Sequence, residues 1–192
     1  GTLSVYSDAG IPAGADILVW GADAWYTITS PTTYDGGFES HGLGTFPTGG
    51  YWQAATPGGG AGSVVNPESA YTGVHGLWSY TGSETWSYWR SAYQEFFASE
   101  GDNFRCSVYV RQPTGEWGTW VAGSRAFLRM NFLDASYQSL WMVDSAVKVT
   151  AEDQGWTLCQ ITNVPTAPRN TKYMRVEVVV DKPAGASGVS VA

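Results

Sequence analysis

Alternation of hydrophobic and polar residues is the feature that most constrains how this chain folds. In residues 104–111 every second residue is apolar, beginning with Phe104, and the residues between them are polar or, at Tyr109, aromatic. Successive side chains of a β-strand point to opposite faces, so this pattern predicts a strand with one face in a hydrophobic core. The same pattern recurs in residues 126–132 and 173–180. No segment shows the periodicity of an amphipathic helix.

Shorter patterns of this kind predict further strands at residues 3–6, 16–20, 25–29, 74–80, 86–98 and 156–162. Residues 42–63 are rich in glycine and are predicted to be a long loop or an insertion. Many strands with one apolar face indicate an all-β fold, a two-sheet antiparallel β-sandwich of the jelly-roll kind. A length of 192 residues suits a single domain. We expect a sandwich over residues 34–192, with residues 1–33 as an N-terminal extension or added strand pair packed on it.

Charge and composition exclude some partners. Lys and Arg total 10 against 17 Asp and Glu, a net charge of −7, and the basic residues are scattered. Nucleic acids and anionic membranes bind clustered basic side chains, so neither is an expected partner. The sequence contains no signal peptide and no transmembrane run. Its composition fits a secreted or extracellular protein, and we expect a monomeric piece of a larger chain with neighbouring modules.

Ten Trp and eleven Tyr are many for a chain of this length. Any one indole ring can serve in the core, but the whole set is difficult to bury. We therefore expect some rings to lie on the surface as stacking platforms. The candidates are Trp86, Trp89, Trp117 and Trp120, with Tyr51 and Trp52 in the glycine-rich segment.

The polar faces of the predicted strands supply further candidate binding residues, namely Gln94, Tyr109, Arg129, Asn131, Arg175 and Glu177. Two interpretations are open. These side chains form cross-strand charge pairs on a half-exposed sheet, or they line a concave sheet and hydrogen-bond to sugar hydroxyls while aromatic rings stack on pyranose rings. On the second interpretation, the arginines also suit a uronic acid or a sulfate, because guanidinium binds such groups in a bidentate way.

A family resemblance rests on motifs in a fixed order, at residues 37–40, 74–76, 93–96, 101–111, 126–135, 155–156 and 164–176. Together they resemble the carbohydrate-binding modules of the galactose-binding-like jelly-roll group, of the family 4, 9, 16 and 22 types. The resemblance implies a non-catalytic module that binds polysaccharide or oligosaccharide and targets an attached secreted glycoside hydrolase or lyase to its substrate. Residues 1–33 have no counterpart in this pattern, and Asp35-Gly36-Gly37 stands where Asn-Pro is common.

The resemblance also implies a structural Ca²⁺. Its ligands would be Glu39 and backbone carbonyls around Phe38 and Gly76, whereas the Asp that the family supplies from its closing strand is missing from this sequence. A hard cation takes six to eight oxygen ligands. The alternative is that Glu39 is an ordinary surface or capping carboxylate.

Catalysis and a purely structural role are the alternatives to binding. A glycosidase needs two carboxylates that face each other across the sugar, and we find no second acid that matches Glu177 on another predicted strand. The sequence also lacks a nucleophile elbow and a His-Glu-x-x-His motif. We therefore expect no enzymatic activity. A structural or adhesive spacer is expected to bury its aromatic rings, so ring exposure separates it from a binding module.

Cys106 and Cys159 are the only cysteines in the sequence, and both fall on apolar faces of predicted strands. A buried disulfide and two free buried thiols are both compatible with this pattern.

Overall fold

The computed structural model describes residues 16–18, 25–27, 44–45, 52–55, 63–66, 71, 73, 76–81, 88–112, 120, 122–151, 155–162, 166–183 and 189–191. Within these ranges the regular structure consists of antiparallel β-strands. These ranges contain no helix that is long and apolar enough to cross a membrane. The protein is an all-β, two-sheet sandwich, as the alternation predicts.

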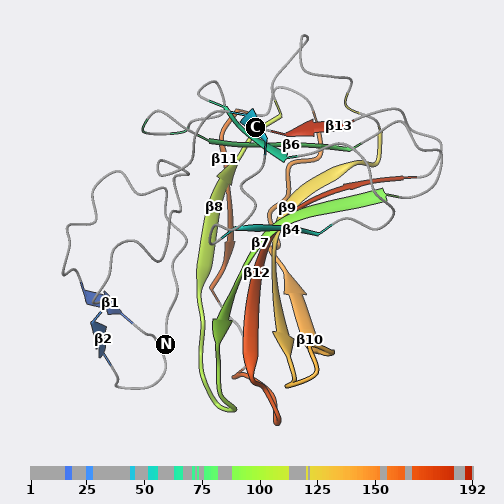
Figure 1. Ribbon diagram of the computed structural model, residues 1–192. Coiled ribbons are helices and arrows are strands. Elements are labelled where there is room, and N and C mark those ends of the chain that lie inside the picture. The colour runs from blue at the N-terminus through green and yellow to red at the C-terminus, as the bar shows by residue number, and fades with distance from the viewer. Residues whose placement is uncertain are drawn as a thin grey trace.

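The largest sheet has five strands in the order β10 (Ser139–Asp144), β9 (Arg125–Leu133), β12 (Tyr173–Lys182), β7 (Tyr88–Phe97) and β4 (Gln53–Ala55). Every neighbouring pair is antiparallel. The three central strands are long and bend along their length (Figure 1). Strand β12 pairs with β7 and β9 in unbroken registers, so side chains of the three strands lie in rows across the sheet.

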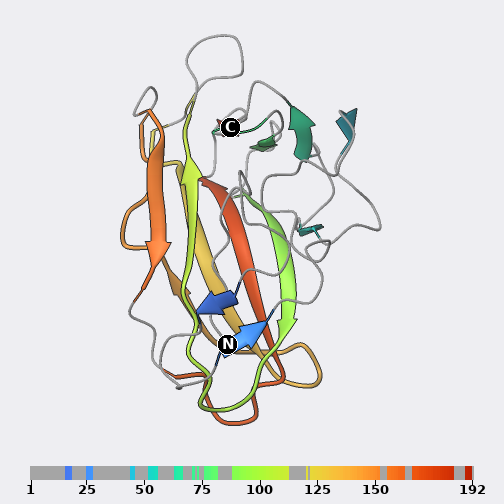
Figure 2. The same cartoon turned by 90° about the vertical axis from the view of Figure 1, so that its left-hand side faces the viewer.

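A second layer covers one side of this sheet. It consists of β8 (Cys106–Val110) and β11 (Thr157–Ile161), which pair with each other and lie in front of the larger sheet in Figure 2. A further sheet at one end of the molecule has the order β13 (Val189–Val191), β6 (Gly76–Thr81), β5 (Ser63–Asn66) and β3 (Gly44–Thr45). Strands β1 (Asp16–Leu18) and β2 (Trp25–Thr27) form a separate pair.

The core lies between the five-stranded sheet and the β8–β11 layer. Alternate residues of β9 and β12 are buried on this side, namely Ala126, Leu128, Met130, Phe132, Met174, Val176, Val178 and Val180. Cys106 and Ile161 belong to the same cluster from the opposite layer. The ring of Phe132 lies 5.8 Å from that of Phe104 and 5.7 Å from that of Trp141, between centroids. The faces predicted for residues 104–111, 126–132 and 173–180 are thus confirmed.

The prediction for residues 42–63 is wrong in part. Strand β3 and the edge strand β4 both lie in this segment, and β5 begins at its end. The strand predicted at residues 3–6 lies outside the described residues. Strands β1 and β2 form a pair within residues 1–33, and the packing of that segment on the sandwich stays a prediction.

Both cysteines are free and buried. They lie on neighbouring strands, where Cys159 pairs with Val108 and Cys106 pairs with Ile161. Burial disfavours the charged thiolate and raises the pKa of Cys106 to about 12 and that of Cys159 to about 11. Of the two possibilities left open by the sequence, the structure has the free thiols.

Candidate functional site

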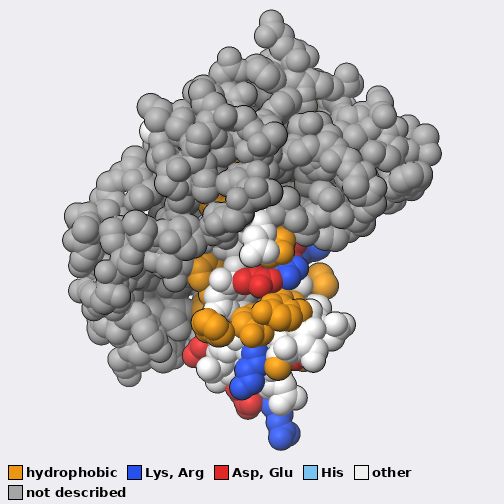
Figure 3. Space-filling view, viewed as in Figure 1, with side chains coloured by type: hydrophobic (Ala, Val, Ile, Leu, Met, Phe, Trp, Pro, Cys, Tyr) orange, Lys and Arg blue, Asp and Glu red, His pale blue; other side chains and the backbone are white. Residues whose placement is uncertain are grey.

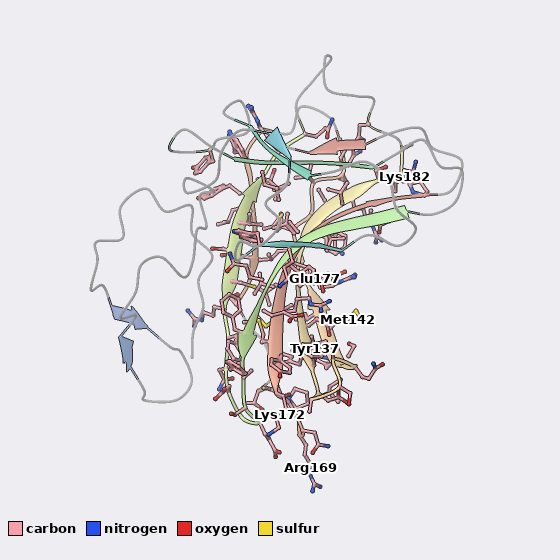
Figure 4. All side chains as sticks on the ribbon, in the orientation of Figure 1. Tyr137, Met142, Arg169, Lys172, Glu177 and Lys182 are labelled. Atoms are coloured by element: carbon pink, nitrogen blue, oxygen red, sulfur yellow. The ribbon has the colours of Figure 1, made fainter. Side chains whose placement is uncertain are left out.

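The outer face of the five-stranded sheet, which points away from the core, carries most of the predicted polar residues. Paired residues of antiparallel strands point to the same face, so the register fixes three adjacent rows. The rows are Phe97, Tyr173 and Leu133; then Glu95, Arg175, Asn131 and Met142; then Gln53, Tyr93, Glu177, Arg129 and Asp144. Arg129, Asn131, Arg175 and Glu177 therefore lie together, as the sequence predicted, although Asn131 and Glu177 are themselves buried. Figure 4 labels Glu177, Met142 and Tyr137 along this face.

Arg175 is fixed at the centre of this face. Its Nε donates to Oε1 of Glu95 at 2.9 Å, and its Nη2 donates to the same oxygen. Its guanidinium carbon lies 4.2 Å from the centroid of the Tyr93 ring. The hydroxyl of Tyr93 donates to Oε1 of Gln53 at 2.8 Å, which joins the β7 row to the edge strand. The carboxylate and the ring together hold the Arg175 side chain in one place.

Arg129 is held in the same manner on the next strand. Its Nε and Nη2 donate to the two carboxylate oxygens of Asp144 at 2.7 and 3.3 Å. Lys148 lies 3.1 Å from the same carboxylate. Burial by itself favours a raised pKa for Asp144, but the hydrogen bonds from Arg129 and Lys148 outweigh it, and the pKa is lowered. Asp144 therefore stays ionised. The cross-strand charge pairs that the sequence left open are present for Arg129 and Arg175.

The prediction that Glu177 has no acidic neighbour is wrong. Glu95 and Asp144 lie on the same face, and Asp181 of β12 follows two rows further on, where it pairs with Arg125. The prediction failed because the alternation of one strand does not show which strands are its neighbours. Glu95, Asp144 and Asp181 are each paired with an arginine.

Three aromatic rings, two of them exposed, lie next to the row of Arg175. Tyr173 stacks on Tyr137, with centroids 4.6 Å apart and an angle of 8° between the planes, and it lies 5.5 Å from Phe97. Phe97 is 88% exposed and Tyr137 is 52% exposed. We call these three residues the ring platform. Figure 3 shows hydrophobic side chains gathered across this part of the face, with charged side chains above and below them.

Tyr109 does not share this face. It lies on β8 with its side chain exposed on the outer side of the second layer. Its ring stacks on Tyr71 at 4.0 Å, and Tyr71 meets the edge of Trp156 at 5.1 Å. Because the core separates the two outer faces, the structure does not bring Tyr109 together with Arg175.

Three further predicted ligand contacts are wrong. Gln94 is buried on the core side of β7, where it pairs with Val176. Trp52 is 1% exposed and belongs to the core. Trp120 packs against the core, and its indole N–H donates to the carbonyl of Thr150 at 2.9 Å. An indole in a glycine-rich segment is thus buried when a nearby carbonyl satisfies its N–H or the segment folds over the core.

Several predicted site residues cannot be placed. Trp86, Trp117, Tyr51, Glu39 and Phe38 lie outside the described residues. Trp89 lies on β7 opposite Asp181, but its side chain is outside the description. Gly76 begins β6 and pairs with Asn66. The described residues contain no group of three or more His, Cys, Asp or Glu able to hold a metal. The Ca²⁺ site stays a prediction.

Sequence reasoning missed the ring platform itself. Alternation could have placed Tyr173 and Phe97 on this face, because Tyr173 precedes Arg175 by two residues and Phe97 follows Glu95 by two. Tyr137 gave no such signal, because it lies in the turn between β9 and β10 with φ of 60°. Only the fold brings its ring over β12.

Comparisons with known proteins support the fold. No protein-family model matches the chain, and no curated protein sequence matches it. One similar solved structure comes from work on the promiscuous specificity of carbohydrate-binding modules from the β-sandwich superfamily; it has a TM-score of 0.55 at 13% identity, over 88% of this chain and 63% of that one.

Two other solved structures are less similar. One is the C-terminal family 22 carbohydrate-binding module of Clostridium thermocellum Xyn10B, with a TM-score of 0.49 at 18% identity over 79% of this chain and 86% of that one. The other is TmCBM61 in complex with β-1,4-galactotriose, with a TM-score of 0.43 at 16% identity over 72% of this chain and 83% of that one. The similarity to the first of the three structures supports a β-sandwich fold. At these identities the likeness is one of fold.

Proposed function

We propose that this protein is a non-catalytic carbohydrate-binding module and that the outer face of its five-stranded sheet binds the glycan. The observation that carries the proposal is the ring platform, two of whose three rings are exposed, beside a row of polar side chains held by hydrogen bonds. A pyranose ring offers an apolar face that stacks on an aromatic ring, while its hydroxyl groups need directional donors and acceptors around it. Both requirements are met within adjacent rows of this sheet.

Preorganisation strengthens the case. The side chains of Arg175 and Glu95 are about one-fifth exposed, and those of Arg129 and Asp144 about one-quarter. Asn131 accepts a hydrogen bond from Ser139 at 2.7 Å. Side chains that are already fixed lose little conformational entropy when a ligand binds. A spacer module has no need of exposed stacked rings beside such a row.

The charges of the face favour a neutral glycan. The basic side chains described there are Arg125, Arg129, Lys148 and Arg175, and the acidic ones are Glu95, Asp144, Glu177 and Asp181. The two sets balance, and all four cations are engaged by carboxylates. A uronic acid or a sulfate would have to displace a carboxylate from its arginine and would face the remaining acids. This argues against the acidic ligand that the arginines alone had suggested.

Affinity electrophoresis tests the proposal. The panel contains xylan, β-1,4-galactan and mixed-linkage β-glucan as neutral polysaccharides, and polygalacturonate and alginate as acidic ones. We expect retention by at least one neutral polysaccharide and none by the acidic pair. If no polysaccharide of the panel slows the protein in the gel, glycan binding on this face is contradicted. Release of reducing sugar or of an unsaturated product would show an enzyme instead.

The variant Glu95→Gln is expected to gain retention by polygalacturonate. Removal of this carboxylate leaves the Arg175 guanidinium with a neutral partner, so a uronate can pair with it. The gain should fall as salt is raised, because partly exposed charges are screened. The double variant Glu95→Gln/Arg175→Met is the matched control and should lose the gain. If polygalacturonate does not retain the single variant, the ion pair between Glu95 and Arg175 does not determine the preference for neutral glycans.

Two wider statements belong to this proposal. We propose that the module is secreted and that it brings an attached glycoside hydrolase or lyase to its substrate, which would make glycan and neighbouring modules its partners. Composition and the net charge of −7 are compatible with this role. The direct measurement is detection of the protein in the culture medium of the cells that produce it.

We also propose a structural Ca²⁺ ligated by Glu39. EDTA should then lower the melting temperature by several degrees, and added Ca²⁺ should restore it, because a ligand of the native state stabilises that state. Glu39→Gln should melt at the lower temperature with or without EDTA. Identical melting curves for the untreated and EDTA-treated protein would remove the metal from the proposal.

A further inference from the structure

A polar cavity lies directly beyond the ring platform. It has a volume of about 590 Å³ and lies where three turns meet at the end of the five-stranded sheet. Its lining includes Ser99, Glu100, Asp134, Ser136, Asn170 and Lys172. We call it the end cavity. Its volume falls within the range of about 300–1,000 Å³ that is usual for small-ligand sites.

The end cavity and the ring platform are built from the same three segments. Phe97 precedes Ser99 by two residues, Tyr137 follows Ser136, and Tyr173 follows Lys172. Figure 4 shows Lys172 at the end of β12, with Tyr137 further along the same face. A ligand stacked on the rings therefore has the cavity as its immediate neighbour.

Hydrogen bonds hold the walls of the cavity in place. The amide of Ala98 donates to the carbonyl of Lys172 at 3.0 Å, and the amide of Lys172 donates to the carbonyl of Leu133 at 2.9 Å. Oδ1 of Asp134 accepts from the amides of Ser136 and Gln138 at 2.7 and 2.9 Å. The three turns are thus joined to one another, and the turn between β9 and β10 is closed on itself.

Backbone strain marks the same place. Among the described residues, only two other than glycine have a positive φ, Tyr137 at 60° and Asn170 at 70°. Such conformations cost energy and are often found at functional sites, where the surrounding structure maintains them. Asn170 lines the cavity and Tyr137 belongs to the platform beside it. The cavity is therefore a built feature of the turns.

We infer that the end cavity is a second subsite, which binds the hydroxyl groups of the sugar unit next to the one stacked on the ring platform. The inference rests on the proposed function. The carboxylates of Glu100 and Asp134 accept hydrogen bonds, and the ammonium of Lys172 and the amide of Asn170 donate them. A hydroxyl both donates and accepts, so vicinal hydroxyls of a neutral sugar match this mixed lining. The ligand then runs from the rings over the end of the sheet.

The test compares oligosaccharides of increasing length by titration calorimetry. The probes are β-1,4-linked xylose and galactose oligosaccharides and mixed-linkage glucose oligosaccharides, each of two to six units. The unmodified protein should show a rise in affinity of about tenfold at the length that first reaches the cavity, as expected for a few added hydrogen bonds. Amide signals of residues 134–138 and 170–172 should shift in NMR spectra only at that length and above.

The cavity variant is Asn170→Gly/Lys172→Met. Glycine adopts φ of 70° without strain, and methionine keeps the apolar stem of the lysine, so the turn should fold. This variant should lose the tenfold rise and keep its affinity for the shorter probes. Arg169→Met removes a charge from the same turn outside the cavity lining and should behave like the unmodified protein. If the cavity variant keeps the full rise of affinity with probe length, the end cavity is not a subsite, but the proposed function stands. If the unmodified protein binds none of the probes, both the subsite and the proposed function are contradicted.

Discussion

Tyr173→Ala is expected to lower the affinity for a retained neutral glycan by at least about tenfold. Tyr173 is the middle ring of the platform, in contact with Tyr137 at 4.6 Å and Phe97 at 5.5 Å. Its removal leaves the exposed rings of Tyr137 and Phe97 without the neighbour that orients them. Affinity gels with the retained polysaccharide measure the change, and thermal melting establishes that the variant is folded.

Tyr109→Ala is the matched control for this prediction. Tyr109 is also a strand tyrosine that stacks on a second tyrosine, Tyr71, but it lies on the outer face of the opposite layer. Its replacement should leave the affinity unchanged. If Tyr109→Ala lost binding and Tyr173→Ala retained it, the glycan site would have to be moved to the β8–β11 face.

This pair of residues also shows what alternation predicts and what it does not. Period-two patterning correctly assigned Tyr109, Arg129 and Arg175 to outward faces. The local sequence is sufficient for this, because it shows which side of a strand is apolar. It gave no means of deciding which outward face each strand presents. Among the described strands, β8 pairs with β11 alone, whereas β9 and β12 pair with each other. That partition depends on strand order, which arises from contacts between residues distant in sequence.

Trp52 and Trp120 were misjudged for a related reason. A glycine-rich neighbourhood suggested exposure for Trp52 and Trp120, but burial of an indole depends on what packs over it. Among the described residues, the side chains of four tryptophans are placed, Trp52, Trp120, Trp141 and Trp156, and none is exposed. Within the described ranges, the exposed rings are those of Tyr71, Tyr109, Tyr137 and Phe97. Composition correctly predicted that some aromatic rings are exposed, but the fold was needed to identify which residue types they are.

The charged residues illustrate a third kind of outcome. The sequence left open whether Arg129 and Arg175 pair within the sheet or await an acidic ligand. Cross-strand geometry settles their pairing, since Glu95 is opposite Arg175 and Asp144 is opposite Arg129 in the register. This face therefore carries arginines that are already paired with carboxylates, which is why the proposed function names a neutral glycan.

The second large effect concerns stability. Phe132→Ala is expected to lower the free energy of unfolding by about 3–5 kcal/mol, the usual cost of removing a fully buried aromatic side chain. Phe132 is 0% exposed and contacts the rings of Phe104 and Trp141 from the centre of the core. Its loss leaves a cavity between β9 and the β8–β11 layer that backbone pairing on both sides prevents from closing. Urea unfolding followed by near-ultraviolet circular dichroism measures the difference.

Phe97→Ala is the matched control for Phe132→Ala, because it removes the same atoms from a side chain that is 88% exposed. Its unfolding free energy should stay within about 0.5 kcal/mol of the unmodified protein, as is usual for surface positions. Its glycan affinity should fall, since Phe97 flanks Tyr173 in the ring platform. The two variants thus separate folding from binding. We expect Phe132→Ala to lower stability without removing a ligand contact, and Phe97→Ala to lower glycan affinity without lowering stability. Equal losses of stability in both variants would mean that Phe97 is covered in solution, and the ring platform would then have no surface to offer a sugar.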